Sequence, residues 1–191
     1  MDHQRWDDTQ IAVLDACVTC AEEKGFAGLT TRRVAELAGV NEVTIFRRFG
    51  SKSGLINAAF EREAAAMSDA VGDYSADLRG DLRRMVTAVW DATGRRRAVL
   101  PAILSELATN AELRSAASHS VREMTRVTDI IAKYQQRGLL IDEPPLQAYA
   151  ALVGPLVYLG IVSRLLPDPP ELDGDAHVEK YLKGHAREEK S

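Results

Sequence analysis

Three helical segments fall within about fifty residues near the start of the chain, and the second and third are joined by a very short turn. Thr30 is a favourable N-cap for the second segment, and Gly39 is a strong signal for its end. Asn41 can cap the third segment, which is predicted over residues 42–49. This order is typical of a helix-turn-helix, although an αα-hairpin with a different role has similar lengths.

The surface of the third segment separates these two interpretations. At about 100° per residue, Ile45 and Phe49 fall on one side of the helix, and Val43 and Arg47 point away from them. The inward pair is expected to form a small core together with Leu37, Val40 and Leu55. The outward face offers a methyl-bearing side chain, a hydroxyl from Thr44 and guanidinium groups, which are the groups that contact base edges and phosphates.

The distribution of charge supports the same interpretation. The whole chain of 191 residues is acidic, with a net charge of −4. Residues 29–52, however, hold five cationic and two acidic side chains, for a net charge of +3. A local positive field of this kind is expected where a protein meets phosphate groups.

Cys17 and Cys20 are the only cysteines, and we interpret them as two small core or boundary residues of the first helix. A structural zinc site needs four ligands, which the sequence does not bring together, and a redox pair stays open without support. The chain lacks a nucleophile elbow, a phosphate-binding loop and an H-E-x-x-H motif. We therefore expect that the protein is not an enzyme, and that it has no catalytic residue, no metal site and no cofactor.

The remainder of the chain also reads as helices, which predicts an all-α fold of about nine helices. Residues 146–166 are nearly all apolar, but Gln147, Pro155 and Arg164 argue against a membrane span. A helix that is apolar all round is buried on more than one side, and a subunit interface is the natural second side. Because the N-terminus is polar and acidic, we expect no signal peptide and a cytoplasmic protein.

The stretch GLTTRRVAELAGVNEVTIFRRFGSKSGL resembles the DNA-binding domain of the TetR family of bacterial transcriptional regulators. The similarity also takes in the preceding EKGFAG, and together these pieces stand in the order and spacing of that family. The resemblance implies a helix-turn-helix DNA-binding domain at residues 7–67, with its motif at about 30–49. It further implies a helical domain for ligand binding and dimerisation at residues 68–191.

The resemblance also assigns candidate contacts with DNA. Thr30, Thr31 and Lys52 match positions that hold phosphate, and Val43, Thr44 and Arg47 match positions that face the bases. Arg33 joins this candidate set, although both Arg33 and the neighbouring Arg32 could be merely solvated.

One position departs from the family pattern. The family usually has Tyr where this chain has Phe46, and the Tyr hydroxyl commonly touches phosphate. Our hypothesis is that Arg47 and Arg48 supply the lost contact, so that Arg48→Ala would weaken binding to all sequences alike. Two alternatives stay open: Phe46 could pack under the domain, and Arg48 could pair with an acid such as Glu36 or Glu61.

For the second domain, the resemblance implies a homodimer formed through the helix at residues 146–166 and the C-terminal helix. Such a dimer would bind a palindromic double-stranded DNA operator, with its recognition helices spaced by about one DNA turn, roughly 34–36 Å. An unknown small-molecule effector would bind in the central helices. The candidates for its pocket, which could instead simply fill the core, are Met85, Trp90, Leu100, Met124, Tyr134 and Tyr158.

The function expected from these features is that of a sequence-specific transcriptional repressor, released from its operator by a small apolar or amphipathic ligand. A transcriptional activator or a ligand-independent DNA binder is the alternative. A helical interaction module that never meets DNA is a more distant one.

Overall fold

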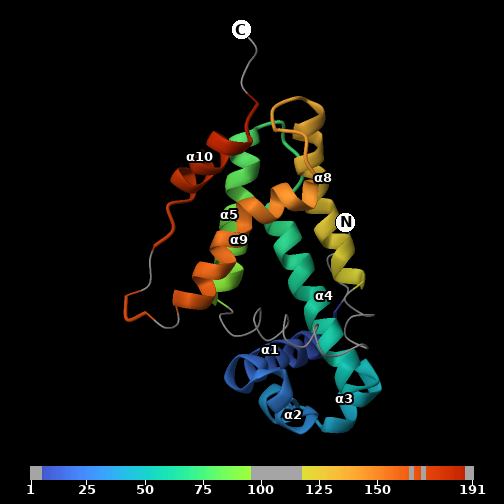
Figure 1. Cartoon of the computed structure of the whole chain (residues 1–191). Coiled ribbons are helices and arrows are strands. Elements are labelled where there is room, and N and C mark those ends of the chain that lie inside the picture. Colours follow the sequence, from blue (N-terminus) through green and yellow to red (C-terminus); the bar gives the residue numbers. More distant parts are fainter. Residues whose placement is uncertain (1–5, 96–117, 164–165, 169–170, 188–191) are drawn as a thin grey trace. The chain divides into compact units, whose positions relative to one another are not determined.

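The computed structural model describes residues 6–95, 118–163, 166–168 and 171–187 (Figure 1). These ranges confirm the all-α fold, since they form helices joined by turns and one isolated antiparallel bridge, between Leu140 and Ala186. Residues 96–117, part of the remainder that the sequence predicts as helical, lie outside the described residues. The described helices are α1 (Asp8–Gly28), α2 (Thr31–Ala38), α3 (Glu42–Phe49), α4 (Lys52–Val71), α5 (Leu78–Arg95), α8 (Ser118–Gln136), α9 (Pro145–Val162) and α10 (Gly174–His185).

Packing divides the chain into two compact units, each with its own hydrophobic core. The first unit contains the described residues up to Glu63 and residues 118–120, and the second contains those from Ala64 to Arg95 and from residue 121 onward. The division expected from the sequence, between residues 67 and 68, falls within α4 and a few residues past this boundary.

The core of the first unit is built from α1 to α4. Val34 from α2, Ile45 from α3 and Leu55 from α4 are fully buried, and Phe49 is partly buried against them. The expectation that Leu37 belongs to this core is wrong, because its side chain is 42% exposed. The buried face of α2 is centred on residues 34, 35 and 38, and a rotation of about 100° per residue turns position 37 away from it.

Side-chain and glycine caps set the ends of the short helices α2 and α3. The Thr30 hydroxyl accepts a hydrogen bond from the Arg33 backbone N–H, and the Asn41 side chain accepts one from Val43 N–H at 2.9 Å. Gly39 ends α2 with a left-handed backbone (φ 67°), a conformation that glycine adopts without steric strain because it has no Cβ atom. These three capping roles are the ones that the sequence predicts.

A second glycine determines how α3 meets α4. A Cβ atom added to Gly54 would lie 2.1 Å from the carbonyl oxygen of Phe49. Only a residue without a side chain therefore allows the first turn of α4 to pack directly on the last turn of α3. Ser51 completes this turn by accepting a hydrogen bond from Gly54 N–H at 2.9 Å.

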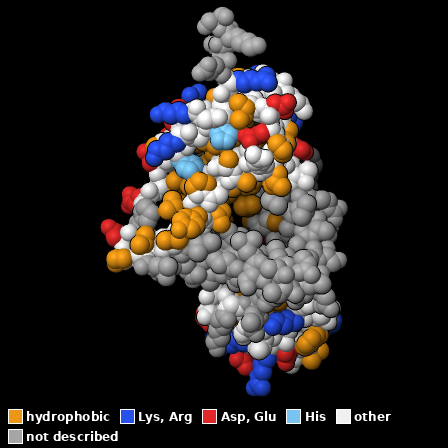
Figure 2. All heavy atoms as spheres, in the orientation of Figure 1, with side chains coloured by type: hydrophobic (Ala, Val, Ile, Leu, Met, Phe, Trp, Pro, Cys, Tyr) orange, Lys and Arg blue, Asp and Glu red, His pale blue; other side chains and the backbone are white. Residues whose placement is uncertain are grey.

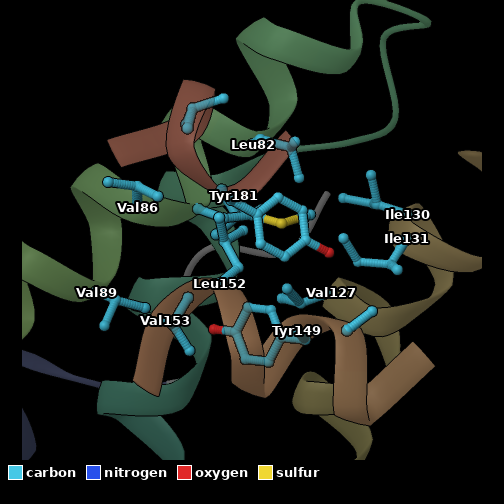
Figure 3. Packing of buried hydrophobic residues seen from close by; sticks show 14 of the residues in the cluster. Leu82, Val86, Val89, Val127, Ile130, Ile131, Tyr149, Leu152, Val153 and Tyr181 are labelled. Atoms are coloured by element: carbon cyan, nitrogen blue, oxygen red, sulfur yellow. The ribbon is translucent and has the colours of Figure 1, made fainter. Parts of the chain in front are cut away.

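The core of the second unit is formed by α5, α8, α9 and α10 and by the end of α4, with α5 packed against α9. In Figure 3, Leu82 and Val86 from α5 converge with Ile131 from α8 and with Leu152 from α9. This arrangement buries one apolar face from each of several helices, and it fixes the orientation of α9 within the unit.

One carboxylate is fully buried in this second core. Asp81 of α5 accepts hydrogen bonds from the Ser75 backbone N–H at 3.0 Å, from the Tyr134 hydroxyl at 2.6 Å and from Arg84 at 2.6 Å. Burial alone would raise the pKa of Asp81, but the bonds from Ser75 and Tyr134 and the charge of Arg84 together lower it. The buried charge is therefore well satisfied, and it ties α5 to α8.

Helix α9 has two apolar faces with different environments. One face is buried in the core, with Leu152 and Leu156 inaccessible to solvent. The opposite face is exposed and small or apolar, and it carries Ala150, Ala151, Gly154, Pro155, Tyr158 and Leu159. Figure 2 shows hydrophobic side chains gathered over this part of the surface. Among the described helices, none combines the length and the apolar character that a bilayer crossing requires.

Candidate nucleic-acid interface

Helix α3 presents the outward face that the sequence predicts. Val43 is 70% exposed and Arg47 is exposed, whereas Ile45 on the opposite side is fully buried. Thr44 is half-buried beside them. Phe46 is 46% exposed, so its ring lies at the surface and not under the domain. The surface of α3 thus combines methyl, hydroxyl, aromatic and guanidinium groups on a helix that is anchored from behind.

The adjacent arginines of α3 have different surroundings. The Arg48 guanidinium forms an ion pair with the carboxylate of Asp7. Arg48 therefore pairs with an acid, as one alternative from the sequence allowed, but this acid is neither Glu36 nor Glu61. Within the described ranges, Arg47 has no carboxylate partner. Since only the unpaired guanidinium has all its donors available, Arg47 is the side chain on α3 best suited to contact a base edge or a phosphate.

Asp7 stands at the beginning of α1, where it also serves as a cap. Its carboxylate accepts a hydrogen bond from Gln10 N–H at 2.9 Å, and the Gln10 side chain accepts one from Asp7 N–H at 3.0 Å. The bond from Gln10 N–H, followed by the pairing with Arg48, holds the pKa of Asp7 below its ordinary value. Next to it, the Trp6 ring lies 6.4 Å from that of Phe49, so the start of α1 rests on the end of α3.

The start of α2 holds three further candidates. The Thr30 side chain is occupied as a cap acceptor, and the Thr31 hydroxyl donates a hydrogen bond to the carboxylate of Glu42 at 2.5 Å. Arg33 is half-exposed and lies 3.8 Å from Glu36, a distant ion pair. Arg32 is 82% exposed and 3.3 Å from the same carboxylate, as expected for a solvated side chain.

Lys52 is the first residue of α4, and its side chain is half-buried. Its positive charge favours the thiolate of the nearby Cys17 and so lowers the pKa of that thiol, but burial has the larger effect and raises the pKa of Cys17 to about 12.

Both Cys17 and Cys20 are reduced and buried in the first core, in agreement with their interpretation as core residues. A thiol with so high a pKa is unreactive at neutral pH.

The candidates for an effector pocket do not all lie together. Met85 and Tyr134 are fully buried in the second core, and Trp90 is partly buried against it. Tyr158, by contrast, is 66% exposed on the outer face of α9. Leu100 and the side chain of Met124 lie outside the described residues. The part of the chain that is described contains no group of three or more His, Cys, Asp or Glu placed to hold a metal ion.

The sequence analysis did not predict the contacts of Asp7 with Arg48 and of Thr31 with Glu42. The capping role of Asp7 had a local signal, because the run Asp7-Asp8-Thr9-Gln10 has an acid three residues before a glutamine. No local pattern links Asp7 to Arg48, which is 41 residues away along the chain. The pairing of Thr31 with Glu42 depends likewise on the packing of α2 against α3.

Residues 13–59 match the family model described as bacterial regulatory proteins, tetR family. This segment covers α2, α3 and most of α1, and therefore the surface described above. Over the whole chain, the fold is similar to that of a putative transcriptional regulator of the TetR family from Vibrio parahaemolyticus. The TM-score is 0.78 at 19% identity, with 95% of this chain and 100% of that one covered.

Two relatives extend the comparison by sequence. An uncharacterized HTH-type transcriptional regulator of Bacillus subtilis, YvkB, is 30% identical over 92 residues, which are 48% of this chain and 49% of that protein. The HTH-type transcriptional repressor NicS of Pseudomonas putida is 28% identical over 151 residues, covering 73% of this chain and 69% of that protein. The chain thus spans about half the length of the first of these relatives.

Proposed function

We propose that this chain, a TetR-family protein by its N-terminal sequence and its fold, is a transcriptional regulator that binds double-stranded DNA in a sequence-specific manner. The observation that carries the proposal is the outward face of α3. There the guanidinium of Arg47, which has no carboxylate partner among the described residues, stands beside the exposed side chains of Val43 and Phe46, on a helix fixed from behind by Ile45. A solvated helix face would more often mix acids and bases at a spacing of four residues.

Each exposed group has a role in this proposal. Arg47 would pair with the edge of a guanine through two parallel hydrogen bonds, and Val43 would contact a thymine methyl group. Thr44 would donate its hydroxyl to a base or a phosphate. Lys52 would hold a phosphate at the N-terminus of α4, where the helix dipole also favours an anion. Thr30 and Arg33 would do so at the start of α2.

We propose a homodimer formed through α9 and α10. The exposed face of α9 that runs from Ala150 to Leu159 supports this, because small and apolar side chains allow a second helix to approach closely. A two-fold axis would then present two copies of α3 to successive major grooves, about 34–36 Å apart, and the operator would be palindromic.

The regulator is proposed to act in the cytoplasm as a repressor that a small apolar or amphipathic effector releases. The similarity to NicS, which is named a repressor, supports the first part. For the second part, Met85, Trp90 and Tyr134 supply apolar and amphipathic groups within one unit. An effector that weakens DNA binding must itself bind more weakly to the DNA-bound protein, by the same factor.

A selection experiment tests the proposal. The purified protein is mixed with fragments of the genome that encodes it, including the region upstream of its own gene, and bound fragments are sequenced. Enrichment of a few fragments that share a palindrome is expected. Equal recovery of all fragments, or of none at low salt, would rule out the proposed function. Release of the enriched fragment by candidate apolar molecules then tests the effector.

A further inference from the structure

The ion pair between Asp7 and Arg48 occupies one of the two arginines of the proposed recognition helix. Asp7 is placed for this by its position as the cap of α1, since Gln10 N–H holds its carboxylate at 2.9 Å. The Trp6 ring beside it lies against Phe49, which follows Arg48 directly in α3. Two neighbouring contacts therefore hold the start of α1 against the last turn of α3, and the pairing does not depend on a single flexible side chain.

Arg48 is less exposed than the two paired arginines of α2, whereas its partner Asp7 is 49% exposed, about as much as Glu36 at 53%. The Arg48 side chain is only 28% exposed, whereas Arg32 is 82% and Arg33 is 48% exposed. A guanidinium that is partly withdrawn from water is screened less by salt than one at the open surface. Moving Arg48 onto a DNA phosphate would also leave the Asp7 carboxylate unpaired, close to a second negative charge.

We propose that Asp7 acts as an internal substitute for a DNA phosphate, keeps Arg48 out of the DNA contact, and thereby sets the strength and salt dependence of binding. This inference rests on the proposed function and assigns a tuning role to a residue outside the helix-turn-helix. The hypothesis from the sequence was that Arg47 and Arg48 supply the contact of a tyrosine hydroxyl. The present inference leaves only Arg47 as the guanidinium of α3 that reaches DNA.

The substitution Asp7→Asn tests this role with little disturbance of the fold. Asparagine is as good an N-cap as aspartate, so the bond to Gln10 N–H is retained while the charge is lost. Arg48 then becomes available to phosphate. The expected result is tighter binding to all DNA sequences alike, with a plot of log K against log salt steeper by about 0.9 for each Arg48 released.

Two further variants make the test specific. Asp15→Asn is the matched control, because it removes the same charge from α1 and releases Arg62 of α4, 2.8 Å away, instead of an arginine of α3. It is expected to leave the salt slope close to that of the wild type. The double variant Asp7→Asn with Arg48→Gln removes both members of the pair, and it is expected to bind DNA as the wild type does.

The opposite results would overturn the inference. If wild-type protein binds DNA but the double variant binds more weakly, with a slope reduced by about 0.9, Arg48 contacts phosphate in spite of Asp7. An unchanged slope for Asp7→Asn would equally contradict it. Failure of the wild type to bind any fragment would instead remove the proposed function itself. As a measurement without variants, the Arg48 Nε–H resonance is expected to stay unchanged when DNA is added, while that of Arg47 shifts.

Discussion

The hydroxyl of Thr31, at the start of α2, donates a hydrogen bond to the carboxylate of Glu42, at the start of α3, over 2.5 Å. This contact joins the N-termini of the two helices of the proposed DNA-binding motif. It also commits the single proton of the Thr31 hydroxyl, which cannot be given to a phosphate at the same time. The negative charge of Glu42 is itself favourable at the beginning of α3, where the helix dipole is positive.

The substitution Thr31→Val is expected to destabilise the protein by about 1 kcal/mol. Valine has nearly the same shape but no hydroxyl, so Glu42 loses its donor while the packing is kept. The free energy of unfolding in urea measures the effect. Thr31→Ser, which retains the hydroxyl, is the control and should lose clearly less. Equal stability of the valine variant and the wild type would mean that the bond contributes nothing.

The substitution Gly54→Ala is expected to destabilise the first unit, although alanine is normally better than glycine within a helix by about 1 kcal/mol. The reason is the backbone oxygen of Phe49, which the new Cβ atom would approach to 2.1 Å. The measurement is the urea midpoint. Gly184→Ala in α10 is the matched control, because no atom lies within 4 Å of its added Cβ. A stabilised Gly54→Ala protein would show that α4 does not pack on α3 in this way.

These two positions illustrate how far the sequence predicts the structure. Thr30, Gly39 and Asn41 act through neighbours within a few residues, so their capping roles follow from the sequence. Gly54 lies close to Phe49 because of the turn between α3 and α4, whereas Arg48 contacts Asp7 only after α1 and α3 have packed together. The periodicity of α3 correctly separated its inward from its outward residues. It could not show which of two adjacent arginines finds a carboxylate on another helix.

The apolar stretch at residues 146–166 likewise shows what composition predicts and what it does not. Its composition predicts a helix with two apolar faces, and α9 has them. Composition alone does not show which residues turn outward. Tyr158 was therefore a candidate for the pocket, whereas the structure places it on the exposed face.

The buried carboxylate of Asp81 is expected to make stability depend on pH in the acid range. Because its pKa is lower in the folded protein than in the unfolded chain, its contribution is complete above about pH 4 to 5 and is lost as the pH falls through the folded value. The stability difference between wild type and Asp81→Asn should therefore shrink as the pH is lowered. Urea titrations at several pH values measure it.

Two further variants belong to this test. Tyr134→Phe removes one donor from the buried carboxylate and should cost about 1.5–3 kcal/mol at neutral pH. Asp175→Asn breaks a solvent-exposed pair with Arg83 and should have little effect. A stability difference for Asp81→Asn that stays constant down to pH 2 would contradict the assigned role of Asp81.

The exposed face of α9 is expected to hold the proposed dimer together. The substitution Tyr158→Glu would place a charge within that contact, and sedimentation equilibrium should then show a shift from dimer to monomer. Thr87→Glu adds the same charge to an exposed position on α5 and should leave the mass unchanged. A wild-type protein that is monomeric at micromolar concentration would rule out the dimer.

The most direct test of the account is the affinity of the wild-type protein for its selected DNA fragment, compared with a scrambled fragment of equal length and composition. Fluorescence anisotropy at salt concentrations from about 50 to 200 mM gives both affinities and their salt slopes. We expect the selected fragment to bind at least about 10³-fold more tightly than the scrambled one, with a steep slope. The variant Arg47→Gln is expected to lose about 1–3 kcal/mol of this preference. Equal affinity of the wild type for both fragments, or no binding to either at about 50 mM salt, would contradict sequence-specific DNA binding.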